Sequence, residues 1–283
     1  MIFFLKNIKL FFSFFFLFFS FSTIHSSGRP TYFPKNKNRT KVFFDRDLLA
    51  PVKGLMTMAG HLHKNIFHKD SVKIIGWSLP FYIEARILDK RLQDGFYDKQ
   101  CHKNVNEPPE WCRVAASSAI AIPILSLASL SVLGRTQELR ITGRVFTVGM
   151  PFVVFGKDII KELRFANCLR PKNEHFKNAK YYGGFPSGHM AEATFMAVLF
   201  GLRRGPSFAI PLGAYAGFIA STFLACNRHY ASQLVAGAAL GTIYAVAANK
   251  LIESRLEKLK NKVAFGLHVD PHTGPAMSIS YRF

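Results

Sequence analysis

The run Phe185–His189, with the sequence FPSGH, is the most specific candidate for a chemical site in this chain. It follows two glycines and stands where we expect a helix to begin, so the backbone N–H groups of Ser187 and Gly188 would face an anion at the positive end of the helix dipole. His189 is placed to move a proton at the same point. The run predicts an anion site with an acid–base histidine, although an ordinary helix cap would use the same residues.

Part of this run, Pro186–His189, resembles the central motif of the type 2 phosphatidic acid phosphatase and vanadium haloperoxidase superfamily. In that family a first motif contains a Lys, six residues and then Arg-Pro. A third motif contains Ser-Arg, five residues, a His, three residues and an Asp. Arg170 and Pro171 match the end of the first motif, and the segment from His229 to Ala238 resembles the third. The motifs occur in the family's order, and the likeness covers roughly residues 114–250.

The resemblance implies a role for each matched residue. His229 would attack phosphorus and form a phosphohistidine, and His189 would protonate the leaving alkoxide. Arg170 would hold phosphate oxygens through its bidentate guanidinium, helped by the backbone of Ser187 and Gly188. The residue types alone also allow other roles: a structural histidine at position 229, and a surface or headgroup-anchoring arginine at position 170.

The order of the elements predicts that these residues meet. If the chain enters a layer of helices at His189, reverses after Arg204 and returns through residues 206–226, His229 emerges on the side where His189 began. The two histidines and Arg170 can then share one pocket.

Two positions depart from the family's phosphate clamp. The family's Lys falls on Leu163, with Lys161 and Arg164 nearby, and one residue along a helix rotates a side chain by about 100°. The Arg of the third motif falls on Phe223, and Arg228 is the candidate to compensate. The chain therefore offers cations near the expected places but not at them.

The third departure concerns the partner of the nucleophile. The Asp that orients the histidine in the family falls on Gln233. An amide still accepts a hydrogen bond from the imidazole, but it cannot stabilise a positive charge there. In a serine protease triad the analogous change lowers turnover by about 10⁴.

These observations favour a phosphomonoesterase that hydrolyses a lipid phosphate or a related phosphate ester, such as a polyprenyl or lipid A type substrate. The departures leave open whether the protein turns over at all. The alternative is a weakened or inactive envelope protein of the same fold that binds anionic lipid. A vanadate-dependent peroxidase ranks third, because the missing Lys and Arg would also have to hold vanadate.

The sequence predicts an all-α fold, a membrane-embedded bundle of five to six helices. Five stretches carry this expectation, and three of them are uncharged and about as long as a membrane span needs. The helices are expected at 114–134, 145–163, 189–202, 206–226 and 231–249, of which the first, fourth and fifth are the apolar ones.

Short basic segments flank these stretches at 135–144, at Arg203 and Arg204, and at 250–262. The positive-inside rule would place all three in the cytoplasm, which leaves the candidate site on the periplasmic or extracytoplasmic side of the cell envelope. A soluble periplasmic bundle is the alternative, because Glu192 interrupts the third helix and the second is short and charged.

Residues 1–27 carry only two charges, Lys6 and Lys9, and a Phe-rich apolar run from Leu10 to Ile24 follows them, which is typical of a signal peptide or an N-terminal anchor. Export would place the following segment where thiols oxidise, so Cys101 and Cys112 are predicted to form a disulfide. Two free thiols, or half of a metal site, are the alternatives for this pair. Cys168 and Cys226 lie near the candidate site, either as buried thiols or as a second pair.

The formal net charge of +20 favours anionic partners, namely a phosphate ester and a membrane surface. No nucleic-acid-binding motif occurs, so nucleic acid is not expected. His61, His63 and His68 have no carboxylate or cysteine at ligand spacing, and we expect no metal and no cofactor. Protein partners cannot be inferred.

The tail changes to an alternating pattern at 263–269 and 277–283 with a turn between them, which predicts a β-hairpin packed on the helices. The domain organisation expected from these patterns is a leader at 1–27, an exported basic arm and loop region at 28–113, the phosphatase-like helical core at 114–250 and the tail at 251–283.

Overall fold

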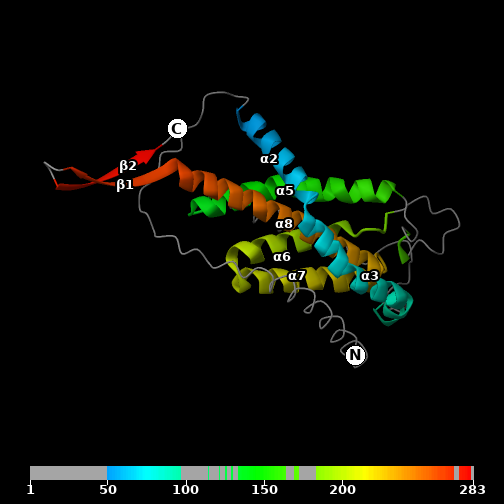
Figure 1. The fold of residues 1–283 in the computed structure, drawn as a ribbon. Helices are drawn as coiled ribbons and strands as arrows, with labels where there is room; N and C mark the ends of the chain where they lie inside the picture. Colours follow the sequence, from blue (N-terminus) through cyan, green and yellow to red (C-terminus); the bar gives the residue numbers. More distant parts are fainter. Residues whose placement is uncertain are drawn as a thin grey trace.

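The computed structural model describes residues 50–96, 133–163, 169–171, 183–270 and 274–281, together with the isolated residues 114, 121, 125 and 129. Within these residues the chain is a bundle of six helices (Figure 1). Their bounds are α2 (Ala50–Ile66), α3 (Lys69–Phe96), α5 (Gln137–Glu162), α6 (Gly188–Arg204), α7 (Pro206–Ala225) and α8 (Ala231–Lys262). The all-helical core of the predicted fold class is therefore confirmed.

Helix α6 lies at the centre of the bundle. Every residue from Met190 to Gly201 is buried, because α5, α7 and α8 all pack against this helix. Helix α8 approaches α6 very closely through Gly237 and Gly241, where a Cβ atom would overlap the backbone carbonyls of Ser187 and Ala191 respectively. This contact holds the start of α6 directly against α8.

The basic flanks predicted from the sequence gather at one end of the bundle. Helix α6 ends at Arg204, Gly205 takes a positive φ of 77°, and α7 begins at Pro206. Arg203 forms ion pairs with Glu138 in the first turn of α5 and with Glu253 in α8. The helix starts that follow Ser187 and Tyr230 therefore lie at the opposite end.

Three of the described helices are long and apolar enough to cross a membrane: Gln137–Glu162, Pro206–Ala225 and Ala231–Leu259. Two of them were expected as spans. The first was expected to be short and charged, but α5 begins at Gln137 and so includes most of the segment predicted as a connector. The predicted span at 114–134 lies largely outside the described residues.

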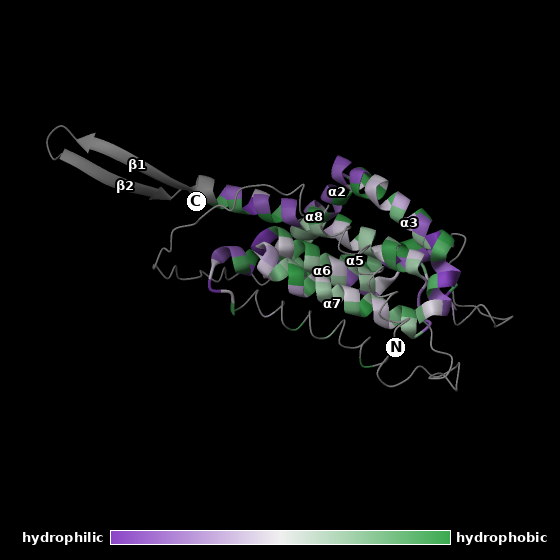
Figure 2. Cartoon of the chain, turned by 90° about the horizontal axis from the view of Figure 1, so that it is seen from below, coloured by the Kyte–Doolittle hydropathy of each residue, from purple (hydrophilic) through white to green (hydrophobic). Residues whose placement is uncertain are grey.

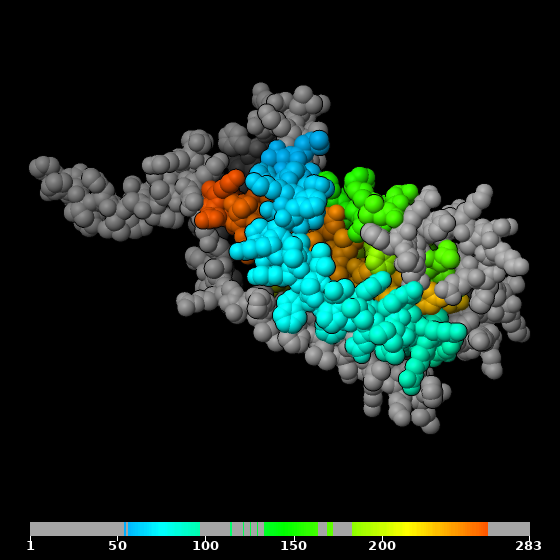
Figure 3. Space-filling model, turned by 45° about the vertical axis from the view of Figure 1, so that its right-hand side comes forward, coloured from blue at the N-terminus to red at the C-terminus, as the bar shows by residue number. Residues whose placement is uncertain are grey.

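Helices α2 and α3 occupy a region that was expected to be an exposed arm and loop, and this expectation is wrong for residues 50–96. Each helix buries a narrow stripe: Met58 and Leu62 in α2, and Ala85 and Phe96 among others in α3. Such stripes, one residue in three or four, are hard to see among many charged residues. In Figure 3 the two helices run across one face of the molecule and cover parts of α8 and α5.

The C-terminal residues form two antiparallel strands, β1 (Val263–Asp270) and β2 (Gly274–Tyr281), paired from Val263 opposite Tyr281 to Asp270 opposite Gly274. In Figure 1 the strands continue from the end of α8 and extend away from the helices. The coloured part of α8 nearest to them is strongly hydrophilic (Figure 2). A hairpin that packs on the bundle is therefore not confirmed.

Candidate active site

Two hydrogen bonds join the three motif segments. The backbone N–H of Ser187, which precedes α6, donates to the carbonyl of Gln233 in the first turn of α8 (3.0 Å). The Gln233 side chain is fully buried, and its Nε2 donates to the carbonyl of Leu169, next to Arg170 (2.7 Å). Gln233 therefore lies where the three segments meet.

The amide of Gln233 also sets the tautomer of His229. Nδ1 of His229 lies 3.2 Å from Oε1 of Gln233, which also accepts from the backbone N–H of Tyr230 (3.2 Å). Because the other end of the amide donates to the Leu169 carbonyl, Oε1 is the acceptor and Nδ1 carries the proton. Nε2 of His229 then keeps its lone pair.

His229 is buried, and this burial lowers its pKa well below the usual range. The positive charge of Arg170 lowers the pKa further, whereas the hydrogen bond to Gln233 acts in the opposite direction. The imidazole is therefore neutral at physiological pH, as a nitrogen nucleophile must be.

The two histidines face one aromatic ring. The Phe223 ring centroid is 5.0 Å from that of His189 and 5.6 Å from that of His229, and both pairs meet edge to face. The Arg228 guanidinium lies 5.8 Å from the same ring. Phe223, at the position where the resembling family has an Arg, therefore gives both histidines the same apolar neighbour.

Arg170 and Arg228 place two guanidiniums beside the histidines. Burial lowers the pKa of both, and the charge of Arg228 lowers that of Arg170 further. Arg170 donates to the Gly183 carbonyl (3.4 Å), but within the described part of the chain neither arginine forms a salt bridge with a carboxylate. Nε of Arg228 and the buried hydroxyl of Ser187 have no hydrogen-bond partner there. The cluster has the donors that an anion would satisfy.

Two lysines of α5, Lys157 and Lys161, lie before position 163, where the resemblance places the family's Lys. Leu163 is 61% exposed, and Arg164 lies outside the described residues. Lys161 interacts electrostatically with Arg170. Lys157, one turn earlier, lies over the start of α6, where its side chain occupies the space that a Cβ on Gly188 would need.

Sequence reasoning missed Lys157. Its only signal was the four-residue spacing from Lys161, which puts both ammonium groups on one face of a helix. The side chain is mostly buried and pairs with Asp158 (2.9 Å). Glu192, one turn into α6, interacts with both lysines and keeps one buried oxygen without a hydrogen-bond partner in the described structure.

A disulfide-bonded cysteine lies next to this cluster in the sequence. Cys226, two residues before Arg228, is disulfide-bonded. The other three cysteines of the chain, and with them the predicted Cys101–Cys112 bridge, lie outside the described residues.

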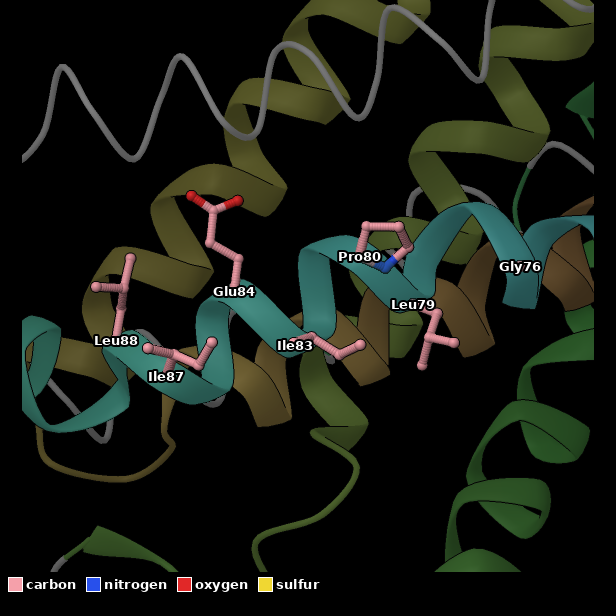
Figure 4. Close-up of a pocket in the computed structure, with 7 residues that line it drawn as sticks. All are labelled: Gly76, Leu79, Pro80, Ile83, Glu84, Ile87 and Leu88. Atoms are coloured by element: carbon pink, nitrogen blue, oxygen red, sulfur yellow. The ribbon is translucent and has the colours of Figure 1, made fainter.

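The cluster differs from the apolar hollow on the outer side of α3 (Figure 4). That hollow is lined by Leu79, Ile83 and Ile87 among others, with Glu84 on its margin, and none of the motif residues reaches it. No group of three or more His, Cys, Asp or Glu side chains that would suit a metal occurs among the residues described.

Comparison with known protein families supports the resemblance at the level of the superfamily. The family model for the PAP2 superfamily matches residues 141–256, which includes α6, α7 and all the motif residues from Arg170 to Gln233. No curated protein and no solved structure matches the chain.

Proposed function

Since residues 141–256 belong to the PAP2 superfamily, we propose that this protein is a phosphatase that hydrolyses a lipid phosphate monoester through a phosphohistidine on His229. One observation carries the proposal: a buried, neutral His229 with its Nε2 lone pair unprotonated lies next to two guanidiniums without carboxylate partners among the described residues. A nucleophile beside an unfilled anion site is what phosphoryl transfer requires.

In the first step the phosphate binds among Arg170, Arg228 and the N–H groups at the start of α6, with Lys157 adding charge. Nε2 of His229 attacks phosphorus, and the bond from phosphorus to the ester oxygen breaks. Burial, and then the charges of Arg228 and Arg170, lower the pKa of His189 to about 4, so this side chain is protonated only once the phosphate dianion has bound beside it. From that state His189 gives its proton to the leaving alkoxide. The products of this step are a free alcohol and phosphohistidine.

In the second step water replaces the alcohol. His189, now neutral, takes a proton from the water as it attacks phosphorus, and the bond between phosphorus and His229 breaks. Inorganic phosphate leaves, and both histidines return to their starting state. Throughout, Gln233 accepts from Nδ1 without supplying a negative charge, so we expect slow turnover.

We place the site on the extracytoplasmic face of a membrane. The basic end of the bundle, around Arg203, suits the cytoplasmic side, and the motif segments lie at the other end. The disulfide at Cys226 also suits an oxidising compartment. A lipid substrate can present its phosphate to this end of the bundle, at the membrane surface, while its acyl or prenyl chains stay in the bilayer.

The test is phosphate release by the purified full chain in detergent micelles. The panel contains phosphatidic acid, a polyprenyl phosphate, a lipid A phosphate and water-soluble glycerol phosphate, and His229→Ala is the control. We expect release from at least one lipid and none from the control. Binding of anionic lipid without any release would instead support a non-catalytic envelope protein.

A further inference from the structure

Helix α3 lies before the segment that matches the PAP2 superfamily, yet it carries a buried polar stripe that points at the candidate site. Asp89 and Gln93 are 4% and 7% exposed. They are four residues apart and so share one face of the helix. Buried carboxylates and amides are costly unless they are hydrogen-bonded, so their partners indicate what the stripe does.

Asp89 caps helix α8 from outside that helix. One carboxylate oxygen accepts from the backbone N–H of Ser232 (2.9 Å), and the other accepts from the Ser232 hydroxyl (2.6 Å) and from Arg86 (3.2 Å). The N–H groups of a first helical turn have no partner within the helix, and a carboxylate is their best external acceptor. Ser232 is the residue next to Gln233, which orients His229.

Gln93 binds the other end of the loop that connects α7 to α8, residues 226–230. Its Nε2 donates to the Leu224 carbonyl at the end of α7 (3.0 Å) and to the side chain of Asn227 (2.7 Å). Asn227 has a φ of 56°, the left-handed conformation in which asparagine is one of the few favoured residues. The two α3 side chains thus bracket the segment that carries Arg228 and His229.

A third contact reaches the central motif. The ring of Tyr82, on the same helix, meets the ring of Phe185 edge to face, with centroids 5.9 Å apart. Helix α3 therefore touches the segments that precede both α6 and α8.

We propose that Asp89 is a positioning residue for the nucleophile, which fixes His229 by capping the first turn of α8 at Ser232. The inference rests on the proposed phosphatase function for its effect on the reaction. Asp89 has no hydrogen bond to His229 and acts through Ser232 and Gln233. A misplacement of the nucleophile by about 1 Å costs on the order of 100-fold in rate, so removing the cap should lower kcat more than it changes KM.

The experiment compares Asp89→Ala, Asp89→Asn and Asp94→Asn in the full chain. Asp94 is an exposed residue of the same helix, so its variant removes the same charge without touching the cap. The readouts are kcat and KM for the best lipid phosphate, and amide hydrogen exchange of the peptide covering residues 224–234. The second readout does not depend on turnover.

We expect Asp89→Ala to lower kcat roughly 10- to 100-fold with KM changed less than threefold. Exchange at Ser232 should become about 10- to 100-fold faster, because a hydrogen bond to a charged group is lost. Asp89→Asn, which keeps an acceptor, should recover most of both values, and Asp94→Asn should match the wild type.

Unchanged exchange in Asp89→Ala overturns the inference, whether or not the wild type is active. Faster exchange with an unchanged kcat shows that the cap does not position the nucleophile, which also overturns it. If the wild type releases no phosphate from any substrate while exchange responds as expected, the proposed function fails, and the cap at Ser232 stands as a structural contact only.

Discussion

Replacing Gln233 by Asp restores the residue that the resembling family has at this position, and it separates two roles of the amide. The first role is to accept a hydrogen bond from His229, which a carboxylate does better because it also stabilises the charge of the phosphohistidine. The second is to donate to the Leu169 carbonyl (2.7 Å), which a carboxylate cannot do. The substitution should therefore raise activity and lower stability together.

The two magnitudes follow from these contacts. The gain in kcat is bounded by the roughly 10⁴ of the serine protease analogy, equivalent to about 5.5 kcal/mol of barrier. We expect less than this bound, because Phe223 still leaves the phosphate without its usual clamp. The loss of the buried donor to Leu169 costs about 1–3 kcal/mol of unfolding free energy, which lowers Tm by roughly 2–12 °C in a chain of this size.

The matched control is Gln233→Leu, a side chain of similar size that has neither the acceptor nor the donor. It should lose a similar amount of stability, but its kcat should fall on the order of 100-fold, because His229 is no longer oriented. The assay is phosphate release together with thermal unfolding in the same detergent. If Gln233→Asp and Gln233→Leu change kcat in the same direction, the amide does not orient a nucleophile and the reasoning is refuted.

Two further substitutions test the packing around the site. Lys157→Met keeps most of the side chain's bulk but removes its charge from the start of α6, so kcat/KM should fall roughly 10- to 100-fold. The exposed Lys64→Met is the control and should leave kcat/KM unchanged. If the two variants have the same kcat/KM, Lys157 does not belong to the site. Gly237→Ala puts a methyl group against the Ser187 carbonyl and should cost about 1–3 kcal/mol in thermal unfolding. Gly60→Ala is the control, because open space surrounds Gly60, and it should leave the unfolding free energy unchanged or raise it by up to about 1 kcal/mol. An unchanged unfolding free energy in Gly237→Ala would contradict the close approach of α8 to α6.

The helices of the core were predictable because their sequences are simple. The stretches that become α7 and α8 are apolar over some 20 residues, and the reversal between α6 and α7 was predicted at Arg203 and Arg204. From that reversal the meeting of His189 and His229 followed as geometry.

Other features were hidden for physical reasons. In α3 three of the five buried residues are polar, so Asp89 and Gln93 look like surface residues until their partners more than 130 positions away are known. Lys157 was overlooked because substitutes for the expected lysine were sought only close to position 163, at Lys161 and Arg164, whereas the Lys157 side chain lies over the start of α6. Such contacts depend on how helices cross, which no local pattern encodes.

Trapping of the covalent intermediate tests the central claim most directly. The purified full chain is mixed with its best lipid phosphate, quenched at alkaline pH to preserve phosphohistidine, and analysed by peptide mass spectrometry. The account predicts phosphate on His229, and none on that peptide in His229→Ala. Phosphate release by the wild type with His229 unmodified, or undiminished release by His229→Ala, would contradict it.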